Sequence, residues 1–329
     1  MKIIMIILFC AFTKIGFSNE NSVKVLMYHR FDQNHYPSTN ISSSLFRKHL
    51  EIIRSENFNV IAIDHLVRIL KEGKELPDKT IVITVDDAFK SFFNNAYPIL
   101  KEFGFPFSIF VSTASISRKK NSDYMSWKML KELSLNGGLI LNHTVNHDSL
   151  LELNDEEIIS QVMSASKEIN SKIGKQPNIL SYPYGESSIR VEKVIEDLGV
   201  EAAFSQHSSP LSNYDFIYRL PRFALNDEYG KIKRFKMILN TERLPINSVS
   251  FKDTIVNQDE LSLAFESDFN AQDINCFINE GATLNKQISD KSFFLKISNL
   301  KVNTRHRLNC TLVQNNNVLW YGKIIKRIN

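Results

Sequence analysis

The sequence predicts an α/β protein in which a parallel β/α barrel precedes a small all-β, sandwich-like domain. Between residues 22 and 222, short β-rich runs alternate with helical patterns, as they do in parallel α/β folds. After about residue 225 the chain changes to short alternating runs separated by Asn, Asp and Gly turns. We therefore expect a segment 1–18 outside the fold, a barrel over 19–225, a linker over 226–243 and a β domain over 244–329.

Strands are expected where apolar and β-branched residues run together. Residues 79–85, with the sequence KTIVITV, form the strongest buried-strand signal in the chain. The other expected barrel strands are 23–28, 60–63, 107–112, 139–141, 179–185 and 200–205. With the intervening helices these make roughly seven units, which suits a closed or nearly closed β/α barrel.

The clearest predicted helix runs from Asn154 to Ile173. Asn154 is a good cap, Glu157 follows three residues later, and Gly174 then ends the helical pattern. Asp64 is expected to cap a second helix that ends before Gly73. Further helices are expected over 45–57, 127–133 and 189–198, with a short one around 232–238 inside the linker.

Composition limits the classes of function. Of the 329 residues, 43% are apolar and 23% are charged, which indicates a folded chain. The net formal charge is +4, and the basic residues are spread along the chain, which argues against a nucleic-acid partner.

The first 18 residues resemble an export signal. Lys2 supplies a basic end, residues 3–12 are apolar, and Gly16-Phe17-Ser18 has the small residues of a cleavage site. The apolar run is short for a membrane span, which needs about 20 residues. A retained anchor or a buried strand is the alternative. Cleavage near Ser18 predicts a secreted or periplasmic protein without a transmembrane segment in the mature chain.

Two cysteines remain after this segment, Cys276 and Cys310. In an exported protein such a pair is compatible with one disulfide, and two buried free thiols are the alternative.

Three polar segments each follow a predicted strand. Asp86 and Asp87 end the first, and adjacent side chains at a strand end point in different directions, so one can bind a metal while the other faces a substrate. The second contains His143 and His147, whose spacing can bring two imidazoles to one metal ion. In the third, SYPYG, the backbone N–H of Tyr184 can point into a cleft. Taken singly, each segment is also compatible with an ordinary polar turn.

Together and in this order, TVDD, NHTVNH and YPYG resemble the motif series of the NodB-like polysaccharide deacetylases, carbohydrate esterase family four. The resemblance also includes VLMYH on the first strand and covers roughly residues 22–225. It implies a distorted (β/α) barrel with the active site at the carboxyl ends of the strands.

The resemblance also implies roles for individual residues. Asp86 would be the catalytic base, while Asp87, His143 and His147 would bind a divalent metal, usually zinc, with cobalt, nickel or manganese as alternatives. The backbone N–H of Tyr184 would stabilise the oxyanion.

This sequence departs from the family pattern at two places. Many members have an arginine at the position of Ser181, and we expect Arg222 to replace it from the last barrel unit. Many members also have a late Leu-x-His motif that provides the general acid, and this chain lacks it. His207 is the first candidate for that role and His29 the second, and both could prove to lie outside the site.

The sequence therefore predicts a metal-dependent hydrolase that removes N-acetyl groups from an N-acetylated polysaccharide. Its alternative is a non-catalytic sugar-binding or polysaccharide-assembly protein that keeps the metal pocket. In the β domain, a disulfide would join two strands, and Trp320 and Tyr321 are expected to pack in the core rather than to bind sugar.

Overall fold

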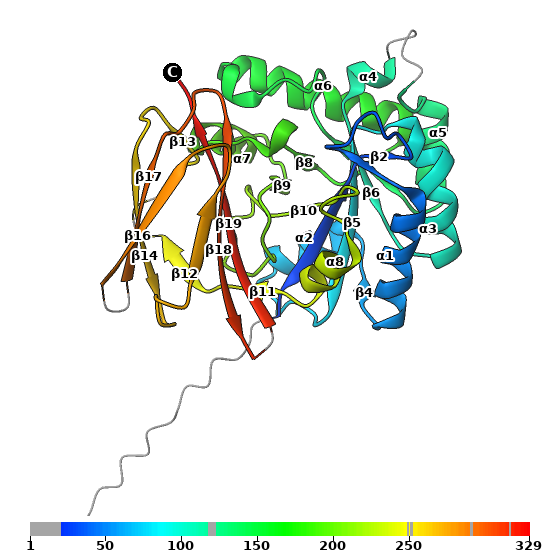
Figure 1. Ribbon diagram of the computed structural model, residues 1–329. Coiled ribbons are helices and arrows are strands. Elements are labelled where there is room, and N and C mark those ends of the chain that lie inside the picture. Colours follow the sequence, from blue (N-terminus) through cyan, green and yellow to red (C-terminus); the bar gives the residue numbers. More distant parts are fainter. Residues whose placement is uncertain (1–20, 118–122, 249, 251–252, 290–291, 316) are drawn as a thin grey trace, which may run out of the picture.

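The computed structural model describes residues 21–117, 123–248, 250, 253–289, 292–315 and 317–329. The predicted export signal lies outside these residues. Two bodies are visible in Figure 1: a parallel sheet surrounded by helices, and a strand-rich module formed by the last part of the chain. Within the described residues, no helix is both long enough and apolar enough to cross a membrane.

An eight-stranded parallel sheet forms the centre of the first body, in the order β10-β1-β5-β6-β7-β8-β9, with β4 also pairing with β5. Its strands are β1 (Val23–Tyr28), β4 (Asn59–Val60), β5 (Thr80–Asp86), β6 (Ser108–Val111), β7 (Leu139–Asn142), β8 (Ile179–Ser181), β9 (Ala202–Phe204) and β10 (Phe223–Ala224). The sheet curls so that its two ends approach each other. Leu220, just before β10, forms a bridge with Phe204 of β9, and β10 itself pairs with β1. The expected β/α barrel is confirmed in this curled form.

Helices cover the outside of the sheet (Figure 1). They are α1 (Ser43–Ser55), α2 (Ile63–Lys71), η1 (Phe92–Ala96), α3 (Tyr97–Phe103), α4 (Thr113–Ser117), α5 (Trp127–Leu135), η2 (Leu150–Glu152), α6 (Asp155–Ile173), η3 (Pro183–Gly185), α7 (Ile189–Asp197) and α8 (Ile232–Leu239). A short parallel pair, β2 (Arg30–Phe31) and β3 (Asn40–Ile41), lies beside them.

Helix starts test the capping predictions. Asn154 caps α6 through a capping box with Glu157, as expected. Asp64, in contrast, is not a cap. Helix α2 begins at Ile63 after Ala62, and Asp64 lies in its first turn, where a negative charge favours the helix dipole.

The C-terminal module consists of two facing sheets. One has the order β11-β19-β18-β15, with β13 also pairing with β19, and the other has the order β12-β14-β17-β16. Their bounds are β11 (Glu242–Arg243), β12 (Ile246–Ser248), β13 (Ile255–Val256), β14 (Leu261–Ser267), β15 (Asn275–Ile278), β16 (Thr283–Ser289), β17 (Ser292–Ser298), β18 (Arg305–Gln314) and β19 (Asn317–Arg327). Apolar residues of both sheets form a separate core. This is the expected all-β arrangement.

A disulfide joins the facing positions Cys276 on β15 and Cys310 on β18, so the alternative of two free thiols is excluded.

The segment expected to be a linker is part of the packed structure. Phe235, Ile238 and Leu239 of helix α8 belong to the barrel core, and Trp320 of β19 joins the same core. The Trp320 ring meets Phe223 of β10 edge to face at 5.4 Å. Trp320 is therefore a packing residue that connects the module to the barrel.

Candidate metal and catalytic site

The three predicted segments meet at one end of the parallel sheet. Asp86 is the last residue of β5, His143 follows β7 directly, and the SYPYG segment begins at the end of β8. Parallel strands place their carboxyl ends at the same edge of a barrel, and catalytic residues in such folds lie there. Residues that are far apart in the sequence are thereby brought into one site.

Asp87, His143 and His147 form a compact triad. One potential ligand atom from each lies within 4.8 Å of the other two. Asp87 Oδ1 is 3.6 Å from His143 Nε2 and 3.4 Å from His147 Nε2. A tetrahedral zinc site with bonds of about 2.0–2.2 Å separates neighbouring ligand atoms by about 3.4 Å. The observed separations thus match those of ligands around one ion.

The tautomer of His143 is fixed by a second contact. Its Nδ1 lies 2.7 Å from the carbonyl oxygen of Ser181, to which it donates, so the lone pair is on Nε2. That buried Nε2 atom has no hydrogen-bond partner among the described residues. A buried polar atom without a partner is costly, and a metal ion would satisfy it.

Electrostatics keep the histidines neutral, as metal ligands must be. Burial, helped by the neighbouring His147, lowers the pKa of His143 to about 3. Burial also lowers the pKa of His147. Burial raises the pKa of Asp87 to about 6, although the charge of His29 opposes the rise. A bound cation would favour the ionised form of this carboxylate.

The loop between His143 and His147 is not helical. Thr144 and His147 both have a positive φ, which is rare for residues with a side chain and especially for a β-branched one. The turn is held by Asn142, whose side chain accepts from the Thr144 N–H at 2.7 Å, and by Thr144 Oγ1, which accepts from the His147 N–H at 3.1 Å. Strained backbone of this kind concentrates at functional sites. Asp87 and Tyr184 share it, with φ values of 71° and 60°.

Asp86 is fully buried and paired with Arg222. The Arg222 guanidinium donates to both carboxylate oxygens of Asp86 at 2.7 Å, in a bidentate arrangement. It also donates to the Ser181 hydroxyl at 2.7 Å. Burial by itself would raise the pKa of Asp86, but the Arg222 charge holds it below its usual value. Arg222 thus contacts Ser181, the residue at the position where the family pattern has an arginine.

Tyr184 lies beside the triad, next to His147. The residue is 42% exposed, and its ring meets the His147 ring edge to face at 4.6 Å. Its carbonyl oxygen accepts a hydrogen bond from Arg305 of the C-terminal module. Arg305 was missed by sequence reasoning, because it belongs to no motif and is 121 positions away from Tyr184.

His207 is not brought to the triad. Its imidazole is buried, and burial together with the positive charges of Lys323, Arg243 and Arg219 lowers its pKa. The segment after β9 is covered by β19, where Gly322 lies directly against the Ser208 carbonyl oxygen. No contact between the His207 side chain and the triad is found among the described residues, and its role as general acid stays a prediction. His29, in contrast, lies close enough to both carboxylates to influence their pKa values.

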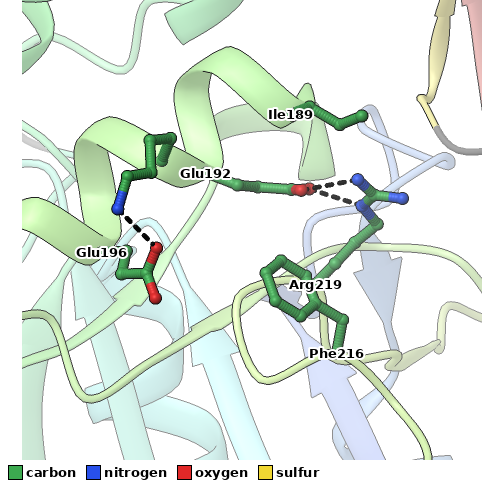
Figure 2. A pocket seen from close by; sticks show the side chains of 6 residues that line it. Ile189, Glu192, Glu196, Phe216 and Arg219 are labelled. Atoms are coloured by element: carbon green, nitrogen blue, oxygen red, sulfur yellow. Dashed lines mark hydrogen bonds and ion pairs between the residues drawn. The ribbon is translucent and has the colours of Figure 1, made fainter.

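A separate cavity of about 350 Å³ lies beside α7 (Figure 2). Arg219 forms a bidentate ion pair with Glu192 there, and Lys193 pairs with Glu196 at 3.0 Å. These charges are satisfied by one another. Apolar Ile189 and Phe216 complete the lining, which includes no residue of the triad.

Comparisons with known proteins place this geometry in context. The family model described as polysaccharide deacetylase matches residues 73–203. The poly-β-1,6-N-acetyl-D-glucosamine N-deacetylase of Staphylococcus aureus is 25% identical over 235 residues, which cover 64% of this chain and 80% of its own.

Two solved structures share the fold. The deacetylase PplD of Streptococcus pyogenes, in complex with acetate, has a TM-score of 0.59 at 18% identity and covers 65% of this chain and 98% of its own. IcaB from Ammonifex degensii has a TM-score of 0.59 at 21% identity and covers 67% of this chain and 97% of its own.

Proposed function

Because the chain belongs to the polysaccharide deacetylase family, we propose that it is a metal-dependent hydrolase that removes N-acetyl groups from an N-acetylglucosamine-type polysaccharide outside the cytoplasm. The observation that carries the proposal is the juxtaposition of the Asp87, His143 and His147 triad with the buried Asp86–Arg222 pair. A metal site beside a fixed carboxylate is an arrangement that can carry out metal-assisted amide hydrolysis.

The donor set fits a divalent metal, with zinc the first choice and cobalt, nickel and manganese as alternatives. One carboxylate and two neutral imidazoles are common zinc ligands, and three protein ligands leave a position for water or substrate. When bound, such an ion polarises the amide carbonyl and lowers the pKa of water towards ~7.

Asp86 is proposed as the general base. Its ionised state is maintained by Arg222, whose two hydrogen bonds also fix the direction of the carboxylate. Asp86 would accept a proton from the attacking water as the new C–O bond forms.

Tyr184 would provide the oxyanion contact. The motif position and the location of its ring beside His147 support a role for its backbone N–H towards the tetrahedral intermediate. A preorganised donor of this type contributes about 3–4 kcal/mol.

His29 is proposed to protonate the leaving amine. It follows β1 at the same edge of the sheet, and its charge acts on both Asp86 and Asp87. The C–N bond then breaks as the proton reaches nitrogen, and the products are acetate and a free amino sugar. This role replaces the one expected for His207.

The proposed compartment and glycan follow from separate observations. The N-terminal sequence is typical of an export signal, and the Cys276–Cys310 disulfide fits an oxidising compartment. Poly-β-1,6-N-acetylglucosamine is the substrate in the name of the Staphylococcus aureus relative, and it is the first glycan to test.

The test is acetate release by the zinc-loaded protein from poly-β-1,6-N-acetylglucosamine, chitin oligomers and peptidoglycan. Asp86→Asn should retain zinc and lose at least about a hundredfold in kcat, because an amide cannot accept the proton. Zinc binding without acetate release on all three glycans would instead favour a sugar-binding or assembly protein.

A further inference from the structure

Two basic side chains of the C-terminal module reach the loop that follows β8. Arg305 on β18 and Lys326 on β19 are direct cross-strand neighbours. Lys326 Nζ lies 2.7 Å from Glu186 Oε2, and both side chains are buried. Arg305 Nε lies 3.7 Å from the other carboxylate oxygen of Glu186, and its Nη1 donates to the Tyr184 carbonyl oxygen.

Glu186 connects this contact to the loop that carries the metal-ligating His147. The hydroxyl of Ser149, two residues after His147, donates to Glu186 Oε2 at 2.5 Å. The buried Glu186 carboxylate, which lies in the segment of Tyr184, therefore contacts both the His147 loop and the C-terminal module.

The Tyr184 segment depends on such outside contacts. Tyr184 has a φ of 60°, a conformation that a tyrosine does not prefer on its own. On one side Gly185 fits tightly, since a Cβ there would lie 2.4 Å from the backbone nitrogen of Gln206. On the other side the Arg305 guanidinium lies 5.5 Å from the centre of the Tyr184 ring, within the range of a cation–π contact.

We propose that Arg305 is a positioning residue of the deacetylation site, which holds the main chain and ring of Tyr184 against His147. A strand of the C-terminal module thereby completes a site whose other parts come from the barrel. The inference rests on the proposed function, because the step that it assists is amide hydrolysis. A charged hydrogen bond to a carbonyl is stronger than a neutral one, and only 28% of the Arg305 side chain is exposed.

Kinetics of Arg305→Ala on zinc-loaded protein provide the first test. We expect kcat to fall by roughly ten- to a hundredfold, with KM within about twofold, because a displaced oxyanion donor affects the transition state more than substrate binding. Arg305→Lys should recover part of kcat, since an ammonium group can still donate to the carbonyl oxygen.

Arg307→Ala is the matched control. Arg307 lies two residues further along β18 and so on the same face of the strand, and no side-chain contact with Tyr184 or Glu186 is found for it among the described residues. It should retain the kcat of the unmodified protein. Equal kcat values for Arg305→Ala and Arg307→Ala would overturn the inference.

Hydrogen–deuterium exchange separates this inference from the proposed function. Amides in a peptide covering residues 182–187 should exchange faster in Arg305→Ala than in the unmodified protein. In Arg307→Ala their exchange rates should equal those of the unmodified protein, and the melting temperatures of the two variants should stay close. Unchanged exchange in Arg305→Ala would contradict the positioning contact even in an active enzyme. If the unmodified protein releases no acetate, the proposed function fails, and the exchange data still decide whether Arg305 holds the loop.

Discussion

At the scale of single residues, the proposed role of Asp86 as the base depends on its ion pair with Arg222. Neither side chain is exposed to solvent. A buried carboxylate stays ionised only when a partner compensates its lost hydration, and here one guanidinium does so with two hydrogen bonds. The same guanidinium contacts Ser181 on β8, so it also fixes the Asp86 carboxylate relative to the Tyr184 segment.

Arg222→Met should therefore reduce both activity and stability. We expect kcat to fall by roughly a hundredfold, because the Asp86 carboxylate loses its orientation and charge partner, and the free energy of unfolding to fall by about 3–5 kcal/mol. Acetate release and urea unfolding measure the two effects.

Arg219→Met is the control for Arg222→Met. Arg219 also forms a bidentate, largely buried ion pair, with Glu192, but it lies beside the separate cavity (Figure 2). Its loss should destabilise the protein while kcat per folded molecule is unchanged. A similar drop in kcat in both variants would show that the Arg222 effect is general destabilisation.

At the scale of elements, helix α1 is anchored by a buried histidine. His49 Nε2 donates to the Gly230 carbonyl oxygen at 2.6 Å, and its Nδ1 accepts from the Tyr28 hydroxyl at 3.1 Å. Its ring stacks on Phe235 of α8 at 3.7 Å. Both nitrogens are thus used by the neutral form, and burial, despite the Gly230 hydrogen bond, lowers the pKa of His49 to about 4.

This contact predicts a pH-dependent stability. Between about pH 6.5 and pH 4 the unfolded His49 binds a proton that the folded form rejects, so stability is lost as the pH falls through this range. His49 alone should cost about 2 kcal/mol at pH 5 relative to pH 7.5. Urea unfolding at both pH values should show a smaller pH effect in His49→Gln, by about this amount.

His65→Gln is the control, because His65 is exposed on α2. It should leave the pH effect on unfolding unchanged. If His49→Gln behaved in the same way, His49 would not be the source of the acid sensitivity.

At the scale of the whole molecule, the C-terminal module and the barrel share a closely packed interface. Trp320 of β19 belongs to the barrel core, and Arg305 and Lys326 reach the loop after β8. Gly322 of the same strand approaches the barrel so closely that a Cβ would lie 2.1 Å from the Ser208 carbonyl oxygen. Figure 1 shows β18 and β19 on the side of the module that faces the barrel.

Gly322→Ala should disturb this interface. The added methyl group meets backbone, which cannot move aside as a flexible side chain can, so we expect a loss of about 1–3 kcal/mol in the free energy of unfolding. Val313→Ala, at an exposed position of β18, should change stability by less than about 0.5 kcal/mol. Equal stability of the Gly322→Ala and unmodified proteins in urea would contradict the close approach.

The sequence by itself determined the strands, most of the helices and the triad residues. Buried strands and amphipathic helices have local periodic patterns. Asp86 ends one such strand, Asp87 and His143 directly follow strands, and His147 comes four residues later; the motif resemblance joined them into one site. The prediction that Asp64 caps α2 was wrong. The first residue of a helix is set by a few backbone angles, and a polar residue near the start of a helical pattern does not identify it.

Only the tertiary structure decided which distant residues complete the site. Arg222 meets Asp86 across 136 positions, and Arg305 meets Tyr184 across 121. These outcomes depend on how the sheet curls and on where the module packs. Such contacts between segments far apart in the chain leave no local pattern of spacing or composition, so they become visible only when the chain is folded.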